Sequence, residues 1–256
     1  MKKVTIFILT HSPRGYIEKI ISALSSSAFI LKNTNIIVST NATDAEYVDY
    51  LTRICADAGV CMKVHDTCDA HTHAHNNYFS CTTDLCMLLH DDDDIFIRDF
   101  EAYISNVLCH PGFGSYSCND KVIINDRIKS NGVSGSESRT LCSFEVSVAY
   151  LLNRHAVCYP SIVYNKRLLK VDFLDQRFGK HTDALLVSKL IDQKHLFFGI
   201  PAIGYRIHDQ QDSAQKCHKK TLLKIYLLKR VFRNISLGNL FILRRILNRI
   251  RYRYIE

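Results

Sequence analysis

The chain has 256 residues, of which 47% are hydrophobic and 23% are charged. This composition is that of an ordinary globular protein and excludes a disordered or low-complexity chain. The length allows one large α/β domain, alone or with an appendage. No run approaches the roughly 20 apolar residues that a membrane-spanning helix needs.

Two features of the composition bear on the cellular compartment. Val4–Leu9 is a short apolar run with no small-residue cleavage site after it, so we interpret it as a first strand and not as a signal peptide. The ten cysteines are scattered along the chain. Without a secretory signal we expect a cytoplasmic protein with free thiols, and we disfavour a disulfide framework.

The net charge of +8 is concentrated at one end of the chain. Residues 216–256 hold twelve Lys and Arg against one Glu, whereas the first 215 residues sum to −3. We predict a basic amphipathic helical tail at 216–256. Such a tail can dock on an anionic membrane, bind nucleic acid or pack on the body. We favour membrane docking and expect no nucleic acid.

The first part of the chain alternates between predicted strands and helices. Strands are expected at 4–9, 35–38 and 61–65. A helix at 16–25 lies between the first two strands, and a second helix, which ends at about Ala58, lies between the second and the third. This alternation indicates βαβ units and a parallel sheet.

A polar segment at 66–75 follows the third strand, and a helix is predicted at Asn76–Thr83. The segment contains His71, His73 and His75. Alternating histidines share one side only in an extended segment, where they could bind zinc. A polar loop is the alternative that we favour.

The most informative stretch is Leu85–Phe96, where apolar residues lead directly into Asp91, Asp92, Asp93 and Asp94. An apolar run of this length is typical of a strand buried on both faces of a parallel sheet. The acidic run then lies at the carboxyl end of that strand, where open α/β sheets bind ligands. Adjacent carboxylates repel one another, and oxygen ligands suit Mg²⁺ or Mn²⁺. A solvated acidic turn is the alternative.

The second part of the chain is less regular. We predict helices at 97–108, 144–154 and 183–193, and one or two helices within 222–254. Strands are expected at 112–118, 122–124 and 161–164, an apolar strand-like run at 196–207, and a loop at 130–139.

Several segments in order resemble the family 2-type glycosyltransferases with the GT-A fold, which act in bacterial polysaccharide and lipopolysaccharide synthesis. The D-x-D-D-hydrophobic motif of that family matches Asp91–Ile95. Residues 36–44 are similar to its nucleotide-binding turn, and 179–183 to the segment that carries its catalytic base. Residues 205–213 match its Tyr-Arg-x-His-x-x-Gln-x-Ser ending. The resemblance covers roughly residues 4–213.

The resemblance implies a GT-A domain at 1–215, with a nucleotide-sugar-binding half at 1–96 and an acceptor half at 97–215. It implies Mn²⁺ or Mg²⁺ held by Asp91, Asp93 and His208. Asp183 would be the catalytic base, with Asp172 and Asp175 as alternatives. The implied donor-binding residues are Thr10, Ser12, Arg14, Asn41, Asp44, Asn76, Asp91 and Arg206.

Each of these residues also has a structural interpretation. Asn41, Asp44 and Asn76 could cap helices; Asn77 is an alternative to Asn76 for the nucleotide contact. Arg206 could pair with phosphate or with a structural carboxylate. Asp92 could face solvent.

The sequence departs from the family pattern at three positions. Ser39 or Thr40 replaces the acid that usually ends the second strand and contacts the nucleotide base. His90 stands where an apolar residue is usual, and Thr182 where relatives often have Glu. These departures concern the choice of donor more than the class of reaction.

The resemblance therefore implies an inverting, metal-dependent transferase that moves a sugar, expected to be uridine-linked, to an O-antigen, capsule or lipopolysaccharide acceptor. The acceptor would be lipid-linked or an oligosaccharide, and the enzyme would lie at the inner face of the cytoplasmic membrane. A metal-dependent phosphohydrolase or nucleotidyltransferase is one alternative. A non-catalytic, basic-tailed membrane or nucleic-acid binding protein is another.

Overall fold

The computed structural model describes residues 2–13, 16–124, 126–131, 137–152, 157–175, 182–207 and 220–233. Its helices are α1 (Ile17–Ser25), α2 (Ala28–Asn33), α3 (Ala45–Ala58), α4 (Ala70–Ser80), α5 (Ile97–Cys109), α6 (Ser143–Leu151), the 3₁₀-helix η1 (Tyr159–Ser161), α7 (Thr182–Ile191) and α8 (Lys220–Arg233). Its strands are β1 (Val4–Thr10), β2 (Thr34–Thr40), β3 (Cys61–Val64), β4 (Leu85–His90), β5 (Asp94–Ile95), β6 (Ser115–Ile124), β7 (Arg127–Asn131), β8 (Arg139–Thr140), β9 (Val163–Asn165) and β10 (His195–Ile207).

All ten strands of the described residues belong to one mixed sheet, in the order β3-β2-β1-β4-β9-β6-β10-β5. Strand β7 pairs with β6, and β8 pairs with β10. Strands β1 to β4 run parallel, as the alternation of strands and helices predicted. Strand β9 is antiparallel to both β4 and β6 and joins the parallel part to the second half. The mixed α/β fold class is therefore confirmed.

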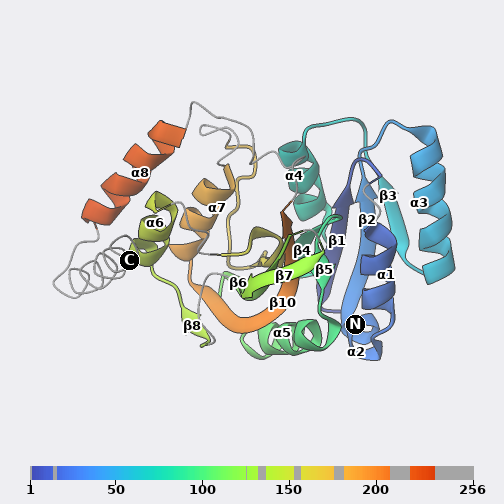
Figure 1. Ribbon diagram of the computed structural model, residues 1–256, viewed down its shortest axis with the longest axis horizontal. Coiled ribbons are helices and arrows are strands. Elements are labelled where there is room, and N and C mark those ends of the chain that lie inside the picture. Colours follow the sequence, from blue (N-terminus) through green and yellow to red (C-terminus); the bar gives the residue numbers. More distant parts are fainter. Residues whose placement is uncertain are drawn as a thin grey trace.

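Side chains of β1 show why this sheet is buried on both faces. Ile6 and Ile8 lie in the core cluster that also contains residues of α1, α3 and α5. Phe7, which points to the opposite face, lies in the second cluster with residues of α4 and α7. Figure 1 shows α6, α7 and α8 together at the end of the molecule far from α3, and the long curled strand β10 running from α7 back to the centre of the molecule.

Local capping explains where two helices near the carboxyl edge of the sheet begin and end. Asp44 accepts hydrogen bonds from the backbone N–H groups of Glu46 and Tyr47 and so starts α3. The helix ends at Gly59, whose φ of 64° is in the left-handed region that favours glycine. Asp69 caps α4 in the same way.

Helix α4 begins at Ala70, six residues before the predicted start. It thus includes the histidines that the sequence analysis placed in a polar loop. In a helix, residues two apart are separated by about 200° around the axis, so His71, His73 and His75 do not share one side. The zinc alternative, which needed an extended segment, is wrong for this reason.

Three other segments differ from the prediction. Residues 115–124 form one strand where two were expected, because the polar pair Asn119 and Asp120 is buried within it. Parts of the predicted loop at 130–139 belong to β7 and β8. Helix α2 was not predicted, since its six residues are too few for a clear helical period.

The described part of the basic tail is α8, which packs on the body through one face. Leu223 and Leu227 lie in a cluster with residues of α7, and Val231 lies in one with residues of α6. Arg230 donates to the side chain of Asp192 at 2.6 Å and to the carbonyl of Ser188 at 2.9 Å. No helix in the described ranges is long and apolar enough to cross a membrane.

Candidate active site

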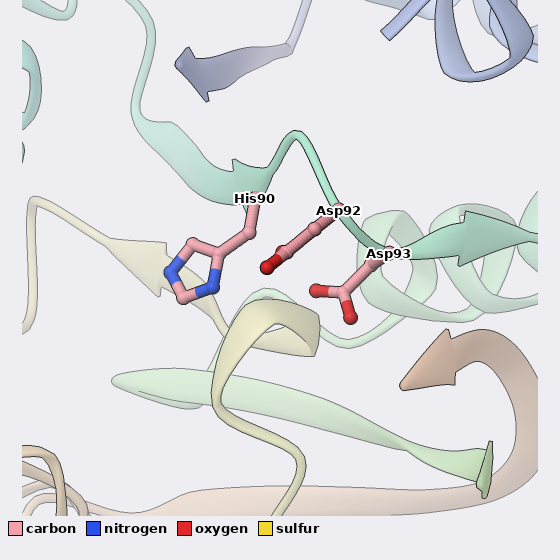
Figure 2. A group of neighbouring side chains, drawn as sticks. All are labelled: His90, Asp92 and Asp93. Carbon is pink, nitrogen blue, oxygen red and sulfur yellow. The ribbon is translucent and has the colours of Figure 1, made fainter. Parts of the chain in front are cut away.

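The acidic run lies at the carboxyl end of β4, and all four of its aspartates are buried. His90, Asp92 and Asp93 each offer one ligand atom, and these atoms lie within 4.8 Å of one another. Figure 2 shows the three side chains directed into a common space beside the turn that follows β4. The alternative that Asp92 faces solvent is wrong, because the turn folds its side chain back toward His90.

Asp93 is the least exposed carboxyl of the acidic run. Its Oδ1 accepts a hydrogen bond from the backbone N–H of Arg206 at 3.4 Å. Its buried Oδ2 has no hydrogen-bond partner among the described residues. Burial raises its pKa well above the usual value, and the charges of Asp92, Asp91 and Asp120 raise it further. A cation bound here would offset both costs, so these residues fit a divalent metal.

Asp91 faces a different neighbour. Its Oδ2 accepts a hydrogen bond of 2.5 Å from the hydroxyl of Thr10, the last residue of β1. The Thr10 hydroxyl also lies 2.6 Å from the hydroxyl of Tyr47. The structure therefore brings the predicted residues Thr10 and Asp91 together, but Asp91 is not a member of the group formed by His90, Asp92 and Asp93.

Asp94 and Arg206 form an ion-pair network beside this group. The Asp94 carboxylate lies 2.8 Å from the Nζ of Lys19 and 2.6 Å from a guanidinium nitrogen of Arg206. Arg206 also pairs with Asp126 at 2.5 Å, and its guanidinium stacks over the ring of Tyr16 at 4.2 Å. Of the two interpretations of Arg206, the structure shows the pairing with carboxylates.

A buried polar network closes the carboxyl end of β2. The Ser39 hydroxyl donates to Oδ1 of Asn77 at 2.9 Å and lies 2.9 Å from Nε2 of His73. Nε2 of His65 lies 3.2 Å from the same Asn77 oxygen. Burial and, to a smaller extent, the charge of His65 lower the pKa of His73 to about 4.

The neighbouring predicted residues have separate positions. Asn76 is exposed on α4, whereas Asn77 faces the network. Asn41 donates to the carbonyl of Cys68 at 2.6 Å, and its Oδ1 is buried without a partner in the described residues. Asp44 is the exposed cap of α3, and Ser12 is half-buried in the turn after β1. Arg14 and His208 lie outside the described residues.

Asp183 is exposed in the first turn of α7. Its charge raises the pKa of Tyr150, Tyr159 and Tyr205, in each case after burial, so it lies near all three tyrosines. Tyr205 is also affected by the charges of Asp93 and Asp92. The charges of Asp183 and of the acidic group therefore act on the same tyrosine of β10.

The two alternatives for a base have less suitable surroundings. The carboxylate of Asp175 is paired with Lys189 at 2.7 Å. Asp172 is exposed, and its carboxylate accepts from the backbone N–H of Leu174. By contrast, the charge of Asp183 acts on tyrosines of α6, η1 and β10.

Sequence reasoning did not include His90 and Asp92 among the metal ligands, and it missed Asp120 and Tyr159 altogether. Asp120 is only 5% exposed in the middle of β6, and its charge acts on Asp93. The signal is the polar pair Asn119–Asp120, which falls in the gap between the strands predicted at 112–118 and 122–124. The Tyr159 ring lies 5.9 Å from that of His90, but no local sequence pattern places it there.

No known protein family and no curated protein matches the chain by sequence. Among solved structures, the S. aureus protein TarS (residues 1–349) in complex with UDP-GlcNAc aligns with a TM-score of 0.65 and 12% identity, over 92% of this chain and 68% of that one. The same protein in complex with UDP aligns with a TM-score of 0.61 and 13% identity, over 92% and 76% of the two chains. The chain therefore has a GT-A-like glycosyltransferase fold.

Proposed function

We propose that this protein is a glycosyltransferase that uses a nucleotide-sugar donor, with UDP as the expected nucleotide. The observation that carries the proposal is the buried group of His90, Asp92 and Asp93 at the carboxyl edge of the sheet. Ligands of open α/β sheets bind at this edge. A protein of the same fold has been crystallised with UDP-GlcNAc and with UDP, which supports the choice of donor.

His90, Asp92 and Asp93 would hold a divalent cation, Mn²⁺ or Mg²⁺. When bound, such an ion neutralises the charge that develops on a departing diphosphate. The chain itself prepares this position. The charges of three further carboxylates act on Asp93, and its Oδ2 has no hydrogen-bond partner in the part of the chain that the structure describes.

The donor would lie along the carboxyl ends of β1 and β2. Asp91, oriented by the Thr10 hydroxyl, is placed to accept hydrogen bonds from a ribose. Asn41 offers a buried carbonyl oxygen on the same side. Asn77 replaces Asn76 as the inward-facing amide of α4, and Asp44 acts as a helix cap.

Asp183 would act as the general base. Its carboxylate would take the proton of the acceptor hydroxyl while the hydroxyl oxygen attacks the anomeric carbon and the bond to the diphosphate breaks. One base and one displacement give inversion at the anomeric carbon.

The acceptor in this proposal is a surface glycan of the O-antigen, capsule or lipopolysaccharide kind, lipid-linked or an oligosaccharide. The outward face of α8 supports a position at the inner face of the cytoplasmic membrane. Ile225 and Leu228 are 46% and 43% exposed there, beside the half-buried Lys224 and the exposed Lys229. Apolar and basic side chains on one helix face suit an anionic bilayer.

Thermal unfolding with UDP-GlcNAc, with and without Mn²⁺, tests the donor site. A ligand at 100 times its dissociation constant stabilises the native state by about 2.7 kcal/mol. We expect the melting temperature to rise with UDP-GlcNAc only when Mn²⁺ is present. If every nucleotide tested stabilised the protein equally, or if no nucleotide stabilised it, the result would count against the proposal.

Product analysis separates the proposal from its alternatives. Donor cleavage that depends on Asp183 and rises with a sugar acceptor indicates a glycosyltransferase. Cleavage that is unaffected by sugar acceptors and by Asp183→Asn indicates a phosphohydrolase. Asp172→Asn is the matched control, since Asp172 is exposed and lies in the same half of the chain.

A further inference from the structure

The amino end of β4 carries a second cluster of reactive side chains, about 17 Å of strand away from the acidic run. Cys81 ends α4, and Cys86 is the second residue of β4. Both are free thiols and both are buried. Both side chains belong to the same buried cluster, and the Cys81 sulfur lies 4.0 Å from the carbonyl oxygen of Leu85, the residue before Cys86.

The surroundings of Cys81 are polar. Its sulfur lies 3.3 Å from the hydroxyl of Thr83, which in turn lies 2.8 Å from the hydroxyl of Thr5. The hydrogen bond from the Cys86 thiol lowers the pKa of Cys81 to about 5, and the hydroxyls of Thr83 and Thr5 contribute. Burial raises the pKa of Cys86 well above the usual value. Cys81 is therefore the nucleophile of the pair, and Cys86 carries the proton.

Cys81 also lines a small open cavity. The cavity has a volume of about 110 Å³, which exceeds the roughly 30 Å³ that a water molecule occupies in the liquid. Its walls include Phe7, Ile37 and the side of Lys63, whose Nζ donates to the Ser80 hydroxyl at 2.7 Å. Cys86 does not line the cavity. A small oxidant can thus approach the pair from the side of Cys81.

We propose that Cys81 and Cys86 form a redox-modification site that hydrogen peroxide, or a peroxide of similar size, converts to a disulfide. The Cys81 thiolate attacks one peroxide oxygen, so that an S–O bond forms, the O–O bond breaks and hydroxide leaves; the hydroxide takes up from solvent the proton that the Cys81 thiol had released, and becomes water. The Cys86 sulfur then attacks the Cys81 sulfenic acid. The S–S bond forms, the S–O bond breaks, and the Cys86 proton leaves with the hydroxyl as a second water.

The disulfide would join the end of α4 to β4. Strand β4 is held on both sides at this point, since Cys86 pairs with Thr5 of β1 and with Tyr164 of β9. Helix α4 carries Asn77, which belongs to the polar network at the end of β2. The disulfide would therefore constrain a helix that extends to the proposed donor site. The oxidation of the two cysteines does not itself depend on glycosyl transfer.

Peptide mass spectrometry of the full-length protein tests the proposal. The reduced protein is treated with one to a few equivalents of hydrogen peroxide, and the remaining thiols are alkylated. We expect the segment containing Cys81 and Cys86 to lose two hydrogens and both alkylation sites, and to recover them after reduction. Cys61, an exposed thiol on β3 outside the pair, should remain alkylated.

Two variants check the order of the steps. Cys86→Ser should stop at a sulfenic acid on Cys81, which dimedone traps, and Cys81→Ser should leave Cys86 unmodified. Cys61→Ser is the control and should behave as the wild type. The proposal would be overturned if Cys61 were oxidised before the pair, or if the peroxide-treated wild type contained no disulfide between Cys81 and Cys86. Both outcomes are measured on the wild type and do not require the variants to fold.

Discussion

Two buried polar clusters of the same sheet differ in how completely the protein satisfies them. His195 is fully buried between β6 and β10, and its two ring nitrogens lie 2.8 Å and 2.7 Å from the hydroxyls of Ser115 and Ser117. At the end of β4, by contrast, Asp93 is 1% exposed, but within the described ranges one of its oxygens has no partner, and the charges of three other carboxylates act on it. A completed cluster stabilises the fold, whereas an incomplete one is arranged for a ligand.

The largest expected effect comes from Asp93→Asn. We expect glycosyl transfer to fall by roughly a hundredfold or more, as when a group that stabilises transition-state charge is removed. The free energy of unfolding without metal should stay the same or rise, because the substitution removes a buried charge from among like charges. Transfer assays and denaturant titrations measure the two quantities.

The exposed Asp84, which pairs with Arg167, supplies the matched control. Asp84→Asn should leave both transfer and stability near the wild-type values. If Asp93→Asn transfers sugar at the wild-type rate, the incomplete cluster is not the reactive centre.

His195 should govern the response of the fold to acid. Burial lowers its pKa to about 3, whereas an unfolded histidine has a pKa near 6.5. Below pH 6.5 the unfolded state binds a proton that the folded state does not, so stability should fall as the pH decreases toward 3. Denaturant titrations from pH 7 to pH 4 measure this loss.

His195→Gln keeps polar atoms near both serines and removes the titration. We expect lower stability at pH 7, by about 1–3 kcal/mol for an imperfectly paired polar group, but a smaller loss on acidification. His71→Gln, on the half-exposed side of α4, is the control. An acid dependence identical in His195→Gln and the wild type would contradict this assignment.

Ser39→Ala probes a cluster of intermediate kind at the end of β2. The substitution removes the hydroxyl that joins Asn77 to His73, so we expect a loss of about 1–2 kcal/mol in the free energy of unfolding. Thermal shifts with UDP measure whether nucleotide binding changes as well. A stability equal to that of the wild type would show that water replaces the hydroxyl.

The smallest effect is expected for Asp126→Asn. Asp126 pairs with Arg206, but its side chain is 77% exposed, and exposed ion pairs contribute less than about 1 kcal/mol. Arg206 keeps its buried partner Asp94 in this variant. Stability measured at low and high salt should differ little from the wild type, and a large loss would mean that the β6–β7 turn depends on this pair.

The sequence by itself determined the parallel half of the sheet and the place of the acidic run. Strands buried on both faces, such as β1 and β4, carry continuous apolar runs, and helix caps such as Asp44 are encoded locally. Such features depend on neighbours in the chain, so a pattern of a few residues suffices to predict them.

Only the tertiary structure decided which side chains meet. His90 joins Asp92 and Asp93 because the turn after β4 folds back. The charge of Asp120 acts on Asp93 although Asp120 lies on a different strand, β6. The single strand β6 and the early start of α4 also depend on burial that no local period reveals. Contacts between distant segments are set by packing and strand register, and these are properties of the whole sheet.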